Sequence, residues 1–433
     1  MNIVMKITKL PLLIAVSFLT LLTGCNNTQP SNQTSTSEPT SSFNDETNVN
    51  KLEGKSLTND DINIIKWEGR YEYREEKNSL PSMMLIYHTA TGFTLDFYGT
   101  EVSATFYHAK DLNNTLACNI YYDVKVDDEV LPNVLNRKIK LPKEETKSTV
   151  KLVGGLQEGR HTITVLKMNE AKDAYTGVID ITTDGHFYQR DVQQDNSRLK
   201  FMAVNASSGS GFGALAYSTT SAYEFSKTNE NSSSLHAYMY LTARRFDADI
   251  SFVATSGWGV KYPNNRSVID IVDYTGVTPT NSSKDAQKDT AKWDHSLYTP
   301  DVIMFHIGGN DTSVDGFDVD TYKEGVITLV TMLHERYPSA KMLWAHTDSK
   351  GGRYAITALK DEGIISQGYI KQCIMPGVGE GTTGHGTYGA SNHQSLKTHI
   401  DSSESLTNTL SRWDFTPVRD QIKFEDFESI LQK

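Results

Sequence analysis

The sequence predicts an antiparallel β-sandwich followed by a three-layer α/β/α domain with a parallel sheet. Residues 62–185 alternate apolar and polar side chains with the period of two that is typical of strands with one buried face. From Leu199 onward, continuous apolar runs alternate with helical patterns, which is typical of a parallel sheet covered on both faces. No helical period interrupts the first region, so we expect two separate domains.

The clearest strand patterns of the first domain lie on either side of Gly99. Phe93 to Phe97 and Val102 to Phe106 each alternate apolar with polar residues, and the short turn between them predicts a β-hairpin with one buried face. The alternation recurs in two later segments, Tyr121 to Val126 and His161 to Leu166. A small antiparallel sandwich is therefore expected over residues 61–190.

The second domain is expected over residues 197–433. Its five apolar runs are Phe201 to Val204, Ile250 to Ala254, Val302 to Ile307, Met342 to Ala345 and Tyr369 to Ile374. One apolar stripe predicts a helix over Asp320 to Tyr337 with Asp320 as its cap, and a second stripe predicts a helix from Leu235 to Phe246. In such a sheet, an active site forms at the carboxyl ends of the strands.

The first residues predict the cellular location of the protein. Lys6 and Lys9 precede an apolar stretch, Leu10 to Leu22, that is short for a membrane span, and Leu22-Thr23-Gly24-Cys25 follows. This pattern resembles a bacterial lipoprotein signal over residues 1–24. The resemblance implies cleavage before Cys25, a lipid on Cys25, and anchoring to a membrane outside the cytoplasm, at the cell surface or in the periplasm. A plain secretory signal with an accidental cysteine is the alternative.

Composition narrows the possible partners. Residues 25–60 are rich in Ser, Thr, Asn and Gln, which predicts a disordered tether between the anchor and the folded domains. The chain has a net charge of −11, and loss of the signal with its two lysines makes the rest more acidic, which argues against a nucleic-acid partner. Cys118 and Cys373 lie far apart without metal-ligand spacing, so we expect two buried thiols in separate domains.

Three polar clusters follow apolar runs and predict the chemistry. Ser207 lies in a Gly- and Ser-rich turn, Gly308-Gly309-Asn310-Asp311 follows the third apolar run, and His393 precedes His399 by six residues. A serine nucleophile needs a base to take its proton and donors to hold the oxyanion, so this set predicts a serine esterase. The alternatives are a linker-like loop at Ser207 and a turn cap at Asn310.

Several sandwich motifs resemble one carbohydrate-active family. They are Lys66-Trp67-Glu68-Gly69-Arg70-Tyr71, Tyr98-Gly99-Thr100-Glu101-Val102-Ser103, and Leu156-Gln157-Glu158-Gly159-Arg160-His161-Thr162 with Lys167 and Glu170 after it. From about residue 62 the chain resembles carbohydrate esterase family 2. In that family a jelly-roll domain precedes a flavodoxin-like domain of the SGNH hydrolase superfamily, which is also called GDSL-like.

The resemblance implies a role for each candidate residue. Ser207 resembles the nucleophile and His393 the base. The backbone amides of Ser207 and Gly257 and the side chain of Asn310 resemble the oxyanion hole. Trp258 is a candidate platform for a sugar ring, with a place in the core or a lid as the alternative.

The remaining polar residues of the clusters receive other roles. His399 resembles a recurring histidine with a structural role, and Asp311 is expected to order its loop. His385 is a rival base. A metal site formed by His385, His393 and His399 lacks the close spacing of a zinc motif, so we expect neither a metal nor an organic cofactor.

Two positions depart from the superfamily pattern. Asn205-Ala206-Ser207 stands where Gly-Asp-Ser is usual, and Ala390 stands three residues before His393, where an orienting Asp is usual. Members of family 2 can work as a Ser-His dyad, so a dyad is expected here.

The expected activity is removal of O-acetyl groups from xylan, glucomannan or their oligosaccharides. Two alternatives stay open. Ala206 and Ala390 also fit a carbohydrate-binding surface lipoprotein whose esterase site has decayed, and an esterase could instead act on acetylated bacterial envelope glycan.

Overall fold

The computed structural model describes residues 56–57, 64–77, 79–108, 118–129, 137–143, 145–190, 195–216, 229–261, 266–278, 289–377, 393–425 and 427. These residues belong to one compact unit, Asn48–Lys433. The predicted signal, Cys25, nearly all of the tether, His385 and Ala390 lie outside the described residues. None of the helices in the described part has the length and apolarity needed to span a bilayer.

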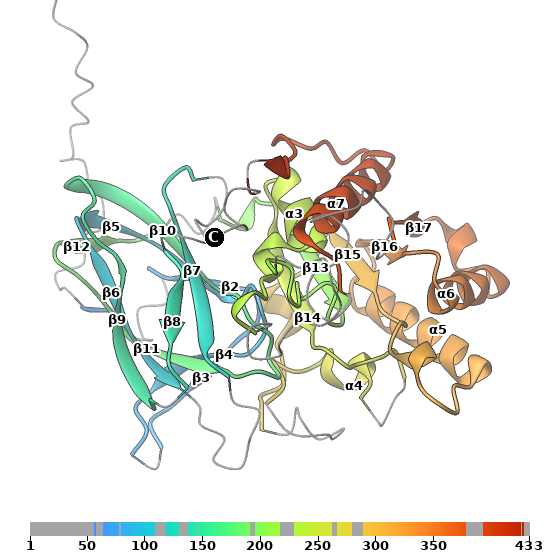
Figure 1. Cartoon of the computed structure of the whole chain (residues 1–433), viewed down its shortest axis with the longest axis horizontal. Coiled ribbons are helices and arrows are strands. Elements are labelled where there is room, and N and C mark those ends of the chain that lie inside the picture. The colour runs from blue at the N-terminus through green and yellow to red at the C-terminus, as the bar shows by residue number, and fades with distance from the viewer. Residues whose placement is uncertain are drawn as a thin grey trace, which may run out of the picture. The chain divides into compact units, whose positions relative to one another are not determined.

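The first domain is an antiparallel sandwich of two sheets (Figure 1). One sheet has the order β3 (Tyr71–Arg74), β4 (Met83–Ile86), β11 (Thr176–Thr183), β6 (Val102–His108) and β9 (Lys147–Val153), with β1 (Ser56–Leu57) beside β11. The other has the order β12 (His186–Tyr188), β5 (Gly92–Gly99), β10 (Gly159–Lys167), β7 (Ile120–Val126) and β8 (Ile139–Leu141), with β2 (Lys66–Glu68) beside β5. Inward-facing side chains of both sheets form one hydrophobic core.

The predicted hairpin of β5 and β6 is wrong. β5 pairs with β10, β12 and β2, whereas β6 pairs with β11 and β9 in the other sheet, so the two strands form an arch across the sandwich. Gly99, with a φ of 149°, permits the crossing, and the Asp184 carboxylate accepts hydrogen bonds from the Thr100 and Glu101 amides at 2.9 and 3.2 Å. Both strands still bury their alternate side chains in one core, so the sequence pattern is the same for an arch and for a hairpin.

The second domain contains a parallel sheet of five strands, as predicted. Its order is β14 (Asp249–Ala254), β13 (Lys200–Asn205), β15 (Val302–His306), β16 (Lys341–His346) and β17 (Ile370–Ile374). This is the flavodoxin-like order, in which the chain reverses its direction across the sheet between the first and third strands.

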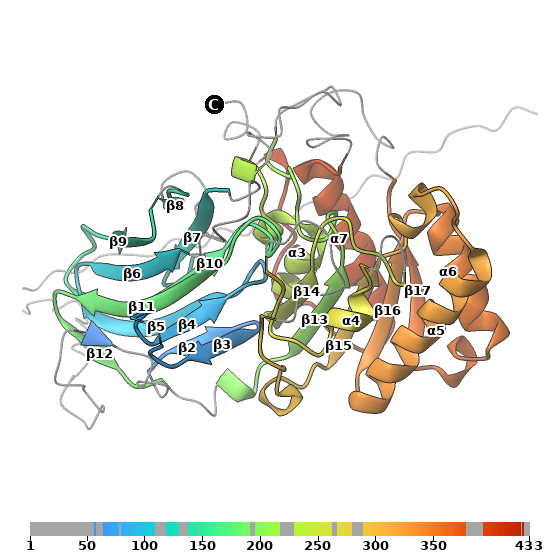
Figure 2. The same ribbon diagram turned by 90° about the horizontal axis from the view of Figure 1, so that it is seen from below.

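Helices cover both faces of this sheet (Figures 1 and 2). Met202 and Val204 pack into a core with α5 (Val319–Arg336), α6 (Lys350–Asp361) and the short α4 (Val268–Ile271). Phe201 and Ala203, which point to the other face, pack into a core with α3 (Tyr238–Arg245) and α7 (Leu396–Ser411). The described residues of the domain also include the 3₁₀ turns η1 (Ser234–His236), η2 (His295–Leu297), η3 (Asp311–Ser313) and η4 (Ile365–Gln367).

Two helix starts differ from their predicted positions. Asp318, and not Asp320, caps α5, because its carboxylate accepts a hydrogen bond from the Thr321 amide at 2.8 Å. The stripe that begins at Leu235 is divided, because Leu235 lies in η1 and the extended residue Ala237 precedes α3. Periodicity alone did not reveal either boundary.

Buried polar side chains join the sandwich to the α/β domain. The Arg70 guanidinium is 1% exposed and donates to the Val272 and Tyr274 carbonyls at 2.6 and 3.0 Å. The Lys167 ammonium donates to three carbonyls, those of Tyr87, Asn169 and Glu170, and burial lowers the pKa of Lys167. These bonds fix the Lys167–Asp173 segment, which reaches the α/β domain. Cys118 is half-buried, Cys373 is buried, and neither belongs to a disulfide.

One buried carboxyl group of the sandwich predicts a pH dependence of stability. Burial raises the pKa of Asp123 on β7 to about 7. The folded state therefore keeps a proton that the unfolded chain releases near pH 4, so stability falls as pH rises from about 4 to 7, by on the order of 4 kcal/mol for this group. Asp123→Asn is expected to unfold at higher urea concentration than the wild type at pH 8 and at a similar concentration at pH 5. The exposed Asp128→Asn is the control, and an equal effect of Asp123→Asn at both pH values contradicts the prediction.

Candidate active site

Strand register brings the polar turns of the second domain together. Asn205, the last residue of β13, pairs with Ala254 at the end of β14 and with His306 at the end of β15. Neighbouring strands lie about 5 Å apart, so the three turns that follow these residues start side by side. This edge is also where the strand order reverses, which is the usual ligand site of such sheets.

The turn that carries Ser207 is tightly bonded within itself. The Phe212 amide donates to the Ser207 carbonyl at 3.1 Å, and the Ser210 amide and hydroxyl both donate to the Ala206 carbonyl. Gly211 has a φ of 69°, and a Cβ there would lie 2.0 Å from the Ser233 carbonyl oxygen, so only glycine fits. The turn is a fixed structure and not the linker-like loop that the sequence left open.

His393 lies beside Ser207. Its Nε2 is 2.7 Å from Ser207 Oγ, which is hydrogen-bond distance. His393 precedes α7, whose first turn is capped by the Ser395 hydroxyl, and the Phe212 ring packs against the imidazole with centroids 4.7 Å apart. The Lys172 ammonium of the sandwich lies 5.1 Å from the centroid of the same Phe212 ring. No pattern in the sequence pointed to a role for Phe212 or Lys172.

The turn after β14 is held by a carboxylate from the sandwich. Glu170 is fully buried, and its two oxygens accept hydrogen bonds from the Ser256 amide and the Ser256 hydroxyl. Gly257 follows with a φ of 79°. Within the described part of the chain, the amides of Ser207 and Gly257 both lack a hydrogen-bond partner. Both N–H groups are therefore available to a ligand oxygen.

The third turn is bonded to the second. The Asn310 side-chain amide donates one hydrogen to the Trp258 carbonyl at 2.8 Å, which leaves its second hydrogen without a partner among the described residues. Asp311 is fully buried and accepts from the amides of Val260 and Lys261 at 3.0 and 3.3 Å. Asp311 orders this loop, and Asn310 has a hydrogen-bond donor to spare.

Two other candidate residues lie in the interior. The Trp258 ring is only 5% exposed and belongs to the hydrophobic core, so this burial argues against a sugar platform and favours the core alternative. His399 is fully buried, stacks on Tyr238, and its Nδ1 accepts a hydrogen bond from the Tyr238 amide at 3.4 Å. Burial lowers the pKa of His399 to about 3, so its imidazole is neutral at physiological pH.

Asn205 and Ala206 stand where Gly and Asp usually precede the serine, and each has a structural role in this protein. The Asn205 side chain is buried and donates to Met239 Sδ at 3.1 Å, while Ala206 supplies the carbonyl that closes the turn. Among the described residues, His, Cys, Asp and Glu side chains form no group of three that could hold a metal ion. The arrangement offers a hydroxyl, an adjacent imidazole and three N–H donors.

Comparison with known proteins gives a family match to the sandwich. The family described as Carbohydrate esterase 2 N-terminal matches residues 68–189. The cellulase/esterase CelE of Acetivibrio thermocellus is 25% identical over 322 residues, which is 72% of this chain and 36% of that protein. The acetylxylan esterase / glucomannan deacetylase of Cellvibrio japonicus is 24% identical over 276 residues, 58% of this chain and 69% of that protein. The match thus spans about a third of CelE.

Solved structures share the arrangement of both domains. A family two carbohydrate esterase from Clostridium thermocellum, solved with cellohexaose, has a TM-score of 0.65 at 23% identity, covering 81% of this chain and 98% of that one. An acetyl xylan esterase from the rumen bacterium Butyrivibrio proteoclasticus has a TM-score of 0.67 at 14% identity, covering 83% and 99%. Residues 68–189 therefore match the carbohydrate esterase 2 N-terminal family, and the chain has the β-sandwich and α/β fold of the solved family two carbohydrate esterases.

Proposed function

We propose that this protein is a carbohydrate esterase that removes O-acetyl groups from polysaccharides or oligosaccharides. The observation that carries the proposal is the distance of 2.7 Å between Ser207 Oγ and His393 Nε2 at the carboxyl edge of the sheet. In acyl-transfer enzymes the nucleophilic serine and its histidine base lie at this distance, beside donors for the oxyanion.

The proposed reaction uses Ser207 and His393 as a dyad. Ser207 Oγ attacks the acetyl carbonyl carbon while His393 Nε2 takes the hydroxyl proton. The ester C–O bond then breaks, and His393 returns the proton to the departing sugar oxygen, which leaves an acetyl group on Ser207. Water, deprotonated by His393, attacks this ester and releases acetate, and the proton returns to Ser207 Oγ.

The oxyanion of each tetrahedral intermediate is assigned to three donors. They are the backbone amides of Ser207 and Gly257 and the second side-chain hydrogen of Asn310. The three residues lie in turns that follow the ends of neighbouring strands. Such donors stabilise the transition state because they already point at the position where negative charge develops.

The substrate class is inferred from the relatives. The Cellvibrio japonicus relative is named an acetylxylan esterase / glucomannan deacetylase, and the Butyrivibrio proteoclasticus structure is an acetyl xylan esterase. The Clostridium thermocellum structure holds cellohexaose. We therefore assign acetylated xylan or glucomannan, or their oligosaccharides, as the substrate of this chain.

The test is release of acetate from defined polymers by the wild type and by Ser207→Ala. Acetylated xylan, acetylated glucomannan and O-acetylated peptidoglycan are compared at equal ester concentration. The proposal expects acetate from xylan or glucomannan, and none with Ser207→Ala. Equal release by both proteins, or no release from any of the three, contradicts the esterase assignment and favours a binding protein. Release from peptidoglycan alone moves the substrate to the bacterial envelope.

We also propose that a lipid on Cys25 anchors the protein to a membrane, facing away from the cytoplasm. The support is the sequence alone, namely the apolar stretch that ends in Leu22-Thr23-Gly24-Cys25. The wild type is expected in the membrane fraction of expressing cells, and Cys25→Ser is expected in the soluble fraction. An unchanged distribution contradicts the anchor.

A buried carboxylate predicts a contribution of the sandwich to the chemistry. Glu170 holds Ser256, the residue before Gly257, so Glu170→Gln replaces one carboxylate acceptor with an NH₂ group that repels a Ser256 donor. We expect kcat for p-nitrophenyl acetate to fall about ten- to hundredfold with little change in KM, less than the 10² to 10³ that loss of an oxyanion donor typically costs. The exposed Glu158→Gln is the control. A kcat equal to that of the control contradicts a positioning role for Glu170.

A further inference from the structure

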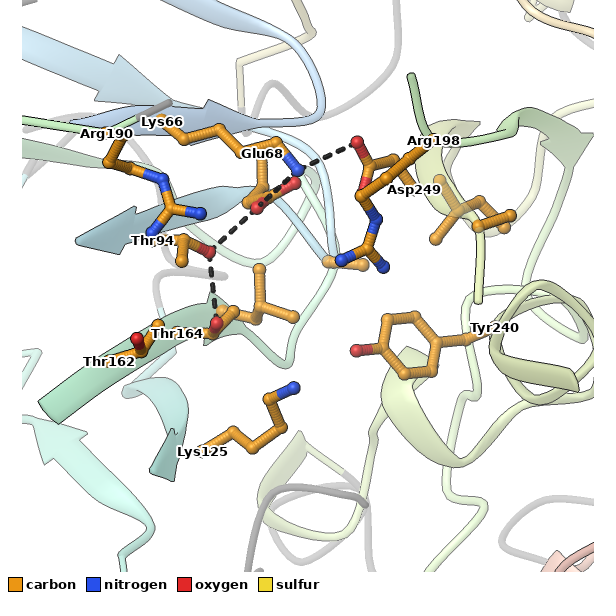
Figure 3. Close-up of a pocket in the computed structure, with 14 residues that line it drawn as sticks. Lys66, Glu68, Thr94, Lys125, Thr162, Thr164, Arg190, Arg198, Tyr240 and Asp249 are labelled. Carbon is orange, nitrogen blue, oxygen red and sulfur yellow. Dashed lines mark hydrogen bonds and ion pairs between the residues drawn. The ribbon is translucent and has the colours of Figure 1, made fainter. Parts of the chain in front are cut away.

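A polar cavity lies at the opposite edge of the parallel sheet from Ser207. Its volume is about 160 Å³, and Asp249 and Ile250, the first residues of β14, line it together with side chains of the sandwich strands β2, β5, β7 and β10 (Figure 3). A strand of six residues separates this edge from the catalytic turns, roughly 17 Å. The cavity contains no residue of the proposed catalytic site.

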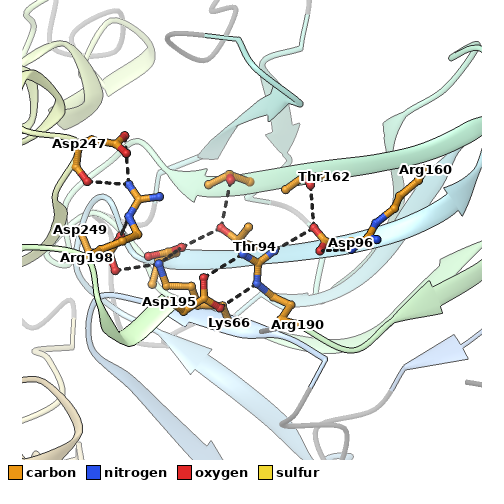
Figure 4. A network of polar contacts seen from close by, with 12 residues as sticks. Lys66, Thr94, Asp96, Arg160, Thr162, Arg190, Asp195, Arg198, Asp247 and Asp249 are labelled. Carbon is orange, nitrogen blue, oxygen red and sulfur yellow. Dashed lines mark hydrogen bonds and ion pairs between the residues drawn. The ribbon is translucent and has the colours of Figure 1, made fainter. Parts of the chain in front are cut away.

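The acidic side chains around this cavity already have cationic partners. Asp249 contacts the Lys66 ammonium at 2.8 Å and the Arg198 guanidinium at 3.1 Å, and Glu68 contacts the same ammonium at 3.3 Å (Figure 4). Arg190 is bound to two further carboxylates, those of Asp96 and Asp195. Each carboxylate of this network is therefore already paired with a cationic side chain, so the network offers no unpaired carboxylate to another cation.

Three hydrogen-bond donor atoms that face the cavity lack a partner among the described residues. Lys125 Nζ, the Tyr240 hydroxyl and Arg198 Nη1 have no hydrogen-bond partner among the residues described. Figure 3 shows the Lys125 ammonium and the Tyr240 hydroxyl pointing into the same space. A partly buried ammonium without an anion is unfavourable, and ammonium, guanidinium and hydroxyl donors in one place are complementary to an oxyanion.

The wider surroundings of Lys125 are also cationic. A smaller cavity of about 60 Å³ shares Lys125, Arg198 and Tyr240 and adds Arg244, Arg419 and Asp247. The Asp247 carboxylate contacts Arg198 at 3.4 Å and Arg419 at 2.6 Å. Burial, followed by Arg198 and Arg419, lowers the pKa of Lys125, and the attraction of Asp247 and Glu68 offsets this only in part. A bound anion supplies a negatively charged hydrogen-bond partner, which the Lys125 ammonium lacks among the described residues.

The other residues that line the cavity indicate what kind of molecule bears the anionic group. The hydroxyls of Thr94 and Thr162 donate to Glu68 and Asp96, both at 2.7 Å, and the Thr164 hydroxyl lies 3.0 Å from that of Thr94. Ala90, Leu166 and Ile250 present apolar surface to the cavity. A cavity of about 150 Å³ takes up a ring the size of benzene, so one six-membered ring has room here. Two carboxylates in the wall, Glu68 and Asp249, disfavour a doubly charged phosphate. We propose that this cavity binds a sugar acid, with its carboxylate at Lys125, Tyr240 and Arg198.

The test is calorimetric titration of the whole chain with sodium glucuronate, glucose and sodium acetate at constant ionic strength. Glucuronate is expected to bind at least about tenfold more tightly than either of the others, because glucose lacks the charge and acetate lacks the ring. Lys125→Met is expected to weaken glucuronate about tenfold or more, and Tyr240→Phe about fivefold. Lys140→Met, on the adjacent strand β8 and exposed, is the matched control and is expected to bind as the wild type does.

The circular dichroism spectrum and the thermal unfolding midpoint report whether Lys125→Met is folded, and neither measurement depends on esterase activity. Undetectable glucuronate binding at millimolar concentration overturns the proposal. So does equal binding by a folded Lys125→Met, or equal binding of glucose. Acetate that binds as tightly as glucuronate removes the sugar from the assignment, and inorganic phosphate that binds more tightly than glucuronate removes the carboxylate. None of these outcomes bears on the deacetylase proposal.

Discussion

Ser207→Ala is expected to reduce kcat for acetate release by at least about 10⁴-fold, because no other hydroxyl of the turn can take its place. Ser207 Oγ lies 2.7 Å from the His393 imidazole, whereas the Ser210 hydroxyl donates to the Ala206 carbonyl within the turn. The initial rate with p-nitrophenyl acetate and with the acetylated polymer measures the loss. The loss should appear in kcat, because the alanine leaves the surface around the nucleophile unchanged.

Ser208→Ala is the matched control for this prediction. Ser208 is the next residue of the same turn, and its carbonyl, which the mutation keeps, accepts a hydrogen bond from the Gly211 amide at 3.2 Å. This variant is expected to stay within a few-fold of the wild type. Comparable losses in both variants would mean that the turn, and not the Ser207 hydroxyl, carries the activity.

His393→Gln is expected to reduce kcat by about 10⁴-fold, because no other base among the described residues lies within hydrogen-bond distance of Ser207. Glutamine keeps a polar side chain beside the Phe212 ring, so the packing around α7 changes little. In His393→Ala, added imidazole is expected to restore part of the activity, since the small molecule can occupy the vacated space and accept the proton. Steady-state rates with and without imidazole measure both effects.

His161→Gln is the control for loss of an imidazole. His161 lies on β10 of the sandwich, where it bonds to Asp127 at 2.8 Å, so the change removes a histidine far from the sheet edge that holds Ser207. A wild-type rate is expected for this variant. Retention of activity by His393→Gln would instead direct attention to His385, the rival base that the sequence left open.

The sequence was sufficient to predict the fold class. Alternation over residues 62–185 indicates strands with one buried face, and the continuous apolar runs after Leu199 indicate strands with two. The structure confirms both predictions. The same signal does not say which strands pair. That is why β5 and β6 were expected as a hairpin, although they lie in opposite sheets.

Parts of the candidate site could be located from sequence, because Ser207, Gly257 and Asn310 each follow the end of a strand and His393 precedes a helix. The support around them could not. Glu170 reaches Ser256 across 86 positions of sequence, and only the folded chain brings a sandwich carboxylate to the turn after β14. The burial of Trp258 and the cap at Asp318 likewise depend on packing that no short motif encodes.

The central claim is that Ser207 is a nucleophile activated by His393. A fluorophosphonate ester, which labels activated serines covalently, tests this claim directly when the modified residue is mapped by mass spectrometry of peptides. The account predicts one label, on Ser207, in the wild type, and a much slower reaction in His393→Gln. A label on another residue, or labelling of Ser207 at the same rate without His393, would contradict it.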